Sequence, residues 1–148
     1  MKTKFQYKDV HSCEAVVLAC IDFRFWKETM KFVEEELGIK VYDFPKLPGA
    51  AKAINDCLSE VDVAMKCIGI PCDLHNAQKI VIVNHADCGA YGGSKQFNGD
   101  DKAEQKFHEG ELQKAKEKIL AQYPGKEVIL AYAKLVDDEE NVEFLKID

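Results

Sequence analysis

Two stretches of the chain decide the fold, Val16–Arg24 (VVLACIDFR) and Ile80–Gly89 (IVIVNHADCG). Each begins with a short run of apolar, partly β-branched residues and ends in side chains that can bind a metal or carry a charge. A short apolar run with no polar face is typical of a strand buried on both sides, as in a parallel sheet. We therefore expect two central strands whose carboxyl ends carry the functional side chains.

The rest of the chain alternates between helix-like and strand-like patterns. Apolar residues three and four apart predict helices, and short apolar or alternating runs predict strands. Gly38 is expected to end the first helix, and Gly69 with Pro71 the second. The expected strands are 14–20, 39–44, 79–84, 127–133 and 142–147, and the expected helices are 24–37, 50–68 and 102–122. Their predicted inner faces are Trp26, Met30, Val33 and Leu37, then Ile54, Leu58, Val61, Met65 and Ile68, then Phe107, Leu112, Ala115 and Ile119.

This alternation predicts an α/β fold of three layers, with a mostly parallel sheet between helices. If the second strand lies on one side of the first and the third on the other, the strand order begins 2-1-3-4. The short last connection predicts an antiparallel edge strand. In open sheets of this kind, ligands bind beyond the carboxyl ends of the strands where the order reverses, here between the first and third strands. Those are the two strands that carry the candidate ligands.

The composition predicts one globular domain over residues 1–148, with 47% hydrophobic and 31% charged residues. The net charge of −6 and the lack of a dense Lys/Arg patch argue against a nucleic-acid partner. No run approaches the ~18 apolar residues of a membrane helix, and no signal-peptide core is seen. Six cysteines without a secretion signal indicate a reducing compartment, so we expect a cytoplasmic protein with no membrane partner. Cys57, Cys67 and Cys72 are expected to be structural, and Cys13 carries no assignment.

The side chains at the two strand ends suggest a zinc site. Cys20, His85 and Cys88 supply two thiolates and an imidazole, the ligands that zinc prefers. Structural zinc sites usually close all four positions with protein groups, whereas a set of three leaves room for water. Zinc lowers the pKa of such a water to about 7, so hydroxide forms near neutral pH. The set of three ligands therefore predicts a catalytic centre.

Asp22 and Arg24 follow the first candidate ligand at two-residue intervals. Asp22 could be a fourth ligand, an acceptor for the hydrogen of bound water, or an ion-pair partner. Arg24 favours the second role, because a bidentate guanidinium keeps a carboxylate ionised and oriented. His11, His75 and His108 are candidates for carrying protons to bulk solvent, although each is expected to be a surface histidine.

Taken together, Cys20-x-Asp22-x-Arg24 and His85-x-x-Cys88-Gly89 resemble the two motifs of the β-class carbonic anhydrases. The resemblance covers roughly residues 14 to 147. It implies one zinc ion per chain on Cys20, His85 and Cys88, and Asp22 with Arg24 as the pair that orients a zinc-bound hydroxide. It also implies reversible hydration of carbon dioxide to bicarbonate and a proton, and a homodimer or higher homo-oligomer.

Three alternatives to this activity follow from the same residues. Lys46–Ala50 (KLPGA) replaces an Arg-Asn-Ala-Gly-Asn-like turn of the family, which favours a zinc-binding relative without the activity. Hydrolases of carbonyl sulfide and carbon disulfide resemble the same family with the same ligands. A third hypothesis dispenses with metal and makes Cys20 or Cys88 a nucleophile activated by Arg24 and His85.

Overall fold

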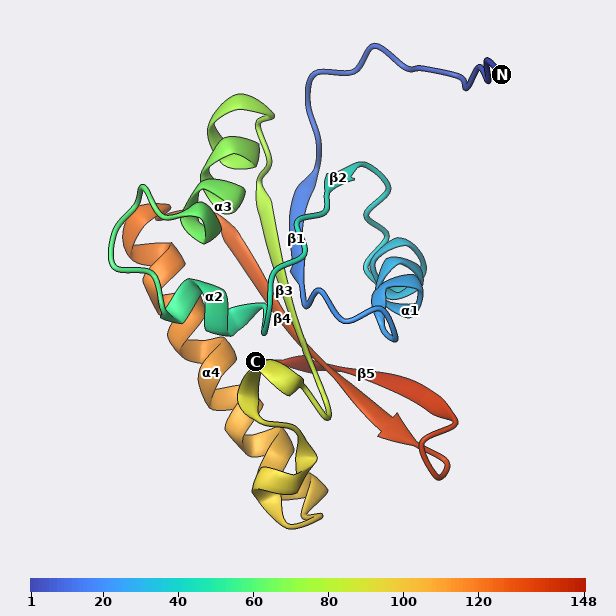
Figure 1. Cartoon of the computed structure of the whole chain (residues 1–148). Coiled ribbons are helices and arrows are strands. Elements are labelled where there is room, and N and C mark those ends of the chain that lie inside the picture. Colours follow the sequence, from blue (N-terminus) through green and yellow to red (C-terminus); the bar gives the residue numbers. More distant parts are fainter.

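The sheet has five strands in the order β2-β1-β3-β4-β5, as predicted (Figure 1). The first four strands in this order run parallel, and β5 pairs antiparallel with β4 at the edge. The computed structural model describes residues 1–148. The strands are β1 (Ala15–Ala19), β2 (Tyr42–Asp43), β3 (Lys79–His85), β4 (Glu127–Val136) and β5 (Asn141–Ile147), and the helices are α1 (Trp26–Lys31), α2 (Ala51–Asn55), α3 (Val63–Leu74) and α4 (Asp101–Gln122).

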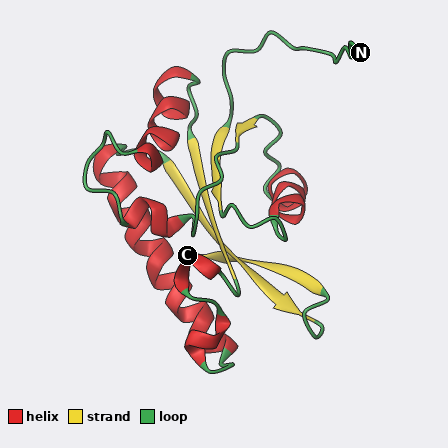
Figure 2. Cartoon of the chain, in the orientation of Figure 1, coloured by secondary structure: helices red, strands yellow, loops and turns green.

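Helices cover both faces of the sheet, which confirms the predicted three layers (Figure 2). Successive residues of a strand point to opposite faces. Val16 and Leu18 of β1 therefore join a core with α2, α3 and α4. Val17 and Ala19 join a second core with Phe25, Phe32 and Val33, which flank α1. All five residues of β1 are buried, as expected for a central parallel strand. No helix is both long and apolar enough to cross a membrane.

The predicted first helix is present, but its inner face is shifted. Phe25, Thr29, Phe32 and Val33 are buried, whereas Trp26 and Met30 are only half-buried. The ring of Phe25, the residue before α1, stacks on His85 at the end of β3 with 4.2 Å between centroids. A π-helical turn, Phe32–Glu36, completes the helix before Gly38 adopts a φ of +70°.

The single helix predicted over 50–68 is wrong, because the chain forms α2 and α3 with a turn between them. The Asp62 carboxylate accepts hydrogen bonds from the backbone N–H groups of Leu58 and Ser59, which gives this backbone an alternative to the helix. Leu58 and Val61, expected to be inside, are 97% and 63% exposed.

The predicted end of that helix at Gly69 and Pro71 is also wrong, since α3 runs on to Leu74. Pro71 removes one helical hydrogen bond. Ile68 and Cys72, before and after Pro71, are buried in the core. Their packing offsets the missing hydrogen bond, and the helix continues past Pro71. The Tyr123 hydroxyl occupies the space that a Cβ at Gly69 would need.

The second strand spans only Tyr42–Asp43, so the predicted 39–44 is too long. Pro45, which follows it closely, has no N–H to donate to a neighbouring strand. Pairing with β1 resumes as a single bridge between Ala19 and Lys46. The next turn is thereby held against the carboxyl end of β1, where Leu47 donates its backbone N–H to the carbonyl of Ala19 at 3.0 Å.

His108 is fully buried, which corrects its assignment as a surface histidine. Asn84 Oδ1 accepts from the N–H of Ala51 at 3.1 Å, so the Asn84 amide group donates to His108 Nδ1 at 3.1 Å. Burial lowers the pKa of His108 to about 4, so its imidazole is neutral near pH 7. Phe107, predicted to be inside, is 40% exposed.

Leu112→Ala should lower the free energy of unfolding by about 2–5 kcal/mol, because Leu112 is fully buried between α4 and the sheet. Leu58→Ala makes the same chemical change at an exposed turn and should alter it by less than about 0.5 kcal/mol. Urea denaturation followed by circular dichroism measures both. Equal losses for the two variants would contradict the break between α2 and α3.

His108 should make the fold sensitive to acid. Its pKa is depressed in the folded chain, so the unfolded chain binds the proton first as pH falls below about 6.5, and the loss is complete below about 4. The free energy of unfolding should fall by about 3 kcal/mol over this range, because each pKa unit corresponds to ~1.4 kcal/mol. Unfolding free energies at pH 7 and pH 4 should therefore differ less in His108→Gln than in the wild type. His11→Gln, at an exposed histidine, should keep the wild-type difference. The same pH dependence in all three proteins would contradict a neutral buried His108.

Candidate metal centre

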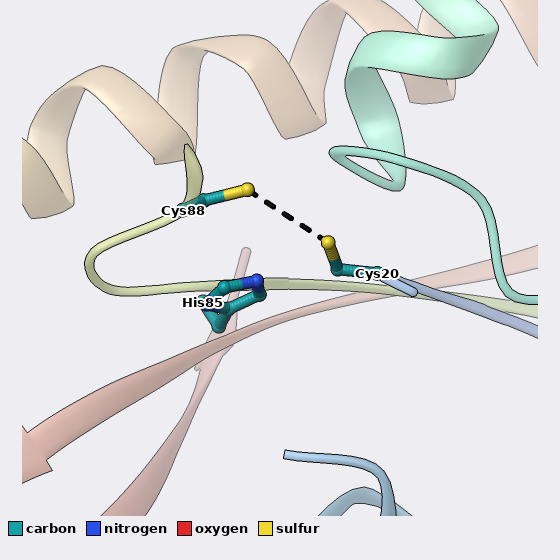
Figure 3. Close-up of side chains that lie close together, drawn as sticks. All are labelled: Cys20, His85 and Cys88. Atoms are coloured by element: carbon teal, nitrogen blue, oxygen red, sulfur yellow. Dashed lines mark hydrogen bonds between the residues drawn. The ribbon is translucent and has the colours of Figure 1, made fainter. Parts of the chain in front are cut away.

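Cys20, His85 and Cys88 meet at the carboxyl ends of β1 and β3 (Figure 3). Cys20 is the residue after β1, His85 is the last residue of β3, and Cys88 lies in the turn that follows. Their ligand atoms all lie within 4.8 Å of one another, and all three side chains are buried. The structure thus brings together the three residues that the sequence singled out.

The orientation of His85 leaves one ring nitrogen free. Its Nδ1 lies 2.7 Å from the carbonyl oxygen of Ala86 and donates its hydrogen there. Nε2 therefore carries a lone pair, and it is buried without a hydrogen-bond partner. A buried polar atom without a partner costs free energy, and a neutral imidazole held in this way is a typical metal ligand.

The two thiols face each other at 3.8 Å between sulfurs. The Cys88 thiol hydrogen-bonds to Cys20 and lowers the pKa of the Cys20 thiol, while the nearby Cys20 sulfur and burial raise the pKa of Cys88. One proton leaves this pair readily, and a second negative charge requires a cation beside it. Two thiols and an imidazole nitrogen without a hydrogen-bond partner form a set of ligands that fits a divalent metal ion.

Gly49 contributes to the site in a way that its sequence context did not indicate. Its backbone N–H donates to Cys20 Sγ at 3.3 Å. Gly49 has a φ of +74°, and a Cβ there would lie 2.8 Å from Lys52 Cβ and 3.1 Å from Ala90 Cβ. Only glycine fits this close approach. The altered Lys46–Ala50 turn therefore keeps the residue that touches the candidate ligand.

Asp22 and Arg24 form the bidentate pair that their spacing suggested. Arg24 Nε and Nη2 bond both carboxylate oxygens of Asp22 at 2.7–3.1 Å, and the Arg24 backbone N–H adds a bond to Oδ1 at 2.9 Å. These contacts hold the pKa of Asp22 below its usual range. Asp22 Oδ2 lies 3.9 Å from His85 Nε2, so the carboxylate borders the metal centre.

Two acidic residues that the sequence reasoning missed hold this pair in place. Asp87 accepts from Arg24 Nη1 at 3.0 Å, and its own backbone N–H donates to the buried Glu104 at 2.8 Å. Glu104 also accepts from the Ser94 hydroxyl at 2.7 Å. A signal was available, because Glu104 and His108 occupy inner-face positions of α4 at the same four-residue spacing as Leu112. Polar residues on the buried face of a helix often support a site.

The centre opens into a hollow of about 670 Å³. Its walls combine the candidate site residues with apolar groups. They are Cys20, Ile21, Asp22, Phe23, Arg24, Pro48, Gly89 and Ala90. A small, uncharged molecule could therefore reach Cys20 and Asp22 from solvent.

The three proposed proton carriers are not gathered at this centre. His11 is exposed and pairs with Asp9, and His75 pairs with Asp43 near the amino end of β1. His108 lies behind Asn84, buried and neutral.

The comparisons with known proteins agree with this geometry. Residues 10–146 match a family model described as "Putative carbonic anhydrase". An uncharacterised protein of Rickettsia conorii is 34% identical over 79% of this chain, and one of Rickettsia bellii is 30% identical over 82%. The chain spans 65% and 77% of the lengths of these two relatives.

Solved structures with little sequence similarity share the fold. A β-carbonic anhydrase isoform I of Trichomonas vaginalis is 14% identical, with a TM-score of 0.59 over 98% of this chain and 87% of its own. A carbonic anhydrase from Glaciozyma antarctica is 14% identical, with a TM-score of 0.54 over 95% and 85%. With the family model matching nearly the whole chain, this protein belongs to the family of putative carbonic anhydrases.

Proposed function

We propose that the protein catalyses the reversible hydration of carbon dioxide to bicarbonate and a proton, with one zinc ion held by Cys20, His85 and Cys88. One observation carries the proposal. Two thiols and an unpartnered imidazole nitrogen converge within 4.8 Å, beside a carboxylate that a guanidinium holds in a bidentate pair. Family membership supports the same activity.

The donor set suits a catalytic rather than a closed centre. Cys20, His85 and Cys88 would fill three positions, and Cys20 also lines the hollow from which water could reach a fourth. Two thiolates balance the charge of a divalent cation. Zinc bound here would supply hydroxide from water near neutral pH, since it lowers the pKa of a coordinated water to about 7.

Asp22 would orient the attacking oxygen. Because Arg24 keeps Asp22 ionised, the carboxylate can accept a hydrogen bond and cannot donate one. Arg24 Nε and Nη2 bond Oδ1 and Oδ2 in a bidentate pair. Oδ2 also lies 3.9 Å from His85 Nε2, so it is the carboxylate oxygen beside the candidate centre and the proposed acceptor for the hydrogen of the nucleophile. By accepting that hydrogen, Asp22 would fix the orientation of the nucleophile toward carbon dioxide. Asp22 and Arg24 are therefore the proposed catalytic residue and its positioning partner.

The hollow suits a small, uncharged substrate. Pro48, Gly89 and Ala90 add apolar surface beside Cys20 and Asp22. Carbonyl sulfide and carbon disulfide share the linear shape of carbon dioxide, so the activity assay should include them. A zinc-binding role without activity is the competing proposal.

We also propose that the chain forms a homodimer or higher homo-oligomer in the cytoplasm. Ile21 and Phe23 at the rim of the hollow are 58% and 81% exposed. Large apolar side chains gathered beside a site favour contact with another protein surface.

Cys88→Ala should lose zinc and carbon dioxide hydration together, because it removes one of three ligands. Zinc content and stopped-flow hydration should be measured on the same preparations. Cys67→Ala removes a half-buried thiol outside the centre and should keep the wild-type hydration rate. Wild-type protein that holds zinc at this centre but hydrates no faster than Cys88→Ala would contradict the enzymatic role. Hydrolysis of carbonyl sulfide or carbon disulfide by that protein would then favour the sister activity.

Asp22→Asn should keep zinc but lower kcat by about 10²-fold or more, the usual contribution of a positioned proton acceptor. The amide has the shape of the carboxylate but can present its NH₂ group to the nucleophile. Arg24→Lys should also lower kcat, since lysine cannot form the bidentate pair. Asp56→Asn, at an exposed carboxylate paired with Lys52, is the matched control. Loss of zinc from Asp22→Asn would instead make Asp22 a metal ligand.

A further inference from the structure

A second group of possible metal ligands lies at the other end of β1. Cys13, Asp43 and His75 have ligand atoms within 4.8 Å of one another. Cys13 precedes β1 by two residues, Asp43 is the last residue of β2, and His75 caps the end of α3. In Figure 1 these three element ends meet at the upper end of the sheet, away from the carboxyl ends of β1 and β3.

Backbone contacts fix the positions of all three residues. The N–H of Cys13 donates to the carbonyl of His75 at 2.9 Å. Asp43 is set by the parallel pairing of β1 with β2, in which Val16 lies opposite Asp43. The convergence is therefore a property of the fold and does not depend on the side-chain contacts alone.

The donor atoms are close to the spacing of a tetrahedral site. Asp43 Oδ2 lies 2.6 Å from His75 Nδ1 and 3.6 Å from Cys13 Sγ. With the usual zinc–ligand distances, a tetrahedral ion separates nitrogen from oxygen by about 3.3 Å and sulfur from oxygen by about 3.5 Å. The imidazole and the carboxylate would need to move apart by only about 0.7 Å. Their side chains are 41% and 37% exposed, so they are free to do so.

The chemistry of the three groups also suits a divalent ion. One thiolate and one carboxylate balance its two positive charges, and a neutral imidazole completes a mixed sulfur, nitrogen and oxygen set. Without a cation, burial and the Asp43 carboxylate raise the pKa of the Cys13 thiol, which then keeps its proton. A bound ion would replace that proton.

The group borders a hollow that could admit a further ligand. This hollow of about 430 Å³ is lined by both Asp43 and His75. Lys66 and Cys67 of α3 also line it. Water could therefore reach a fourth coordination position from this side.

We propose that Cys13, Asp43 and His75 form a second metal site, selective for a divalent ion with the preferences of zinc. The ion would join the segment before β1, through Cys13, to the ends of β2 and α3, and its role would be structural. The inference does not rest on the proposed function, because the two sites share no residue and lie at opposite ends of β1.

Cobalt(II) binding to the full chain tests the proposal. Chelator-stripped, reduced protein should bind two cobalt ions per chain, and Cys13→Ser and His75→Gln should each bind one. Both variants should keep carbon dioxide hydration if the wild type has it. His11→Gln, which removes an exposed histidine nearby in sequence, should still bind two. Circular dichroism and the Tm of each metal-free variant would verify that it folds.

A second measurement separates the two sites. Cys88→Ala should still bind one cobalt ion, with a thiolate-to-cobalt absorption band that disappears when Cys13→Ser is added. Zinc should raise the Tm of Cys88→Ala and leave the double variant unchanged. A wild-type chain whose bound ions are all retained in Cys13→Ser would overturn the proposal, and so would loss of an ion in His11→Gln. Loss of hydration activity in Cys88→Ala, with the ion at Cys13, Asp43 and His75 retained, would support the proposed function and the second site separately.

Discussion

The parallel pairing of β1 with β3 is the constraint on which the candidate centre depends. Ala19 lies opposite Val83 in this ladder, so Cys20 and His85 leave the sheet at the same edge. Both strands are buried on both faces, and a slip of one residue would exchange the side chains of the two cores. Burial of apolar strands thus fixes the register, and the register fixes the distance between the candidate ligands.

Around this edge, charged groups are paired in a chain that reaches from α4 to the centre. Glu104 accepts a hydrogen bond from the backbone N–H of Asp87. The Asp87 carboxylate pairs with Arg24, and Arg24 in turn pairs with Asp22. Glu104 is buried, and a buried carboxylate needs hydrogen-bond donors to offset its lost hydration. The N–H of Asp87 and the Ser94 hydroxyl supply them. The turn after β3 is consequently tied to α4, which holds Cys88 and Asp22 in fixed relation.

The two ends of β1 show how one strand can serve two groups of polar residues. At its carboxyl end the ligand-type residues come from β1 and β3, where the strand order reverses. At its amino end they come from the chain before β1, from β2 and from the end of α3. The pairing of β1 with both neighbours positions each group through the backbone.

The sequence by itself determined the α/β class, the strand order, the antiparallel edge strand and the three residues that meet at the centre. These follow from local apolar patterns and from a general rule on where parallel sheets bind ligands. Tertiary structure alone decided that Leu58 and Val61 are exposed, that α3 continues through Pro71 and that His108 is buried. It also decided the Gly49 contact with Cys20 and the Asp87 contact with Arg24. Such contacts join residues far apart in the chain, and helical or strand periodicity carries no information about which distant side chains will meet.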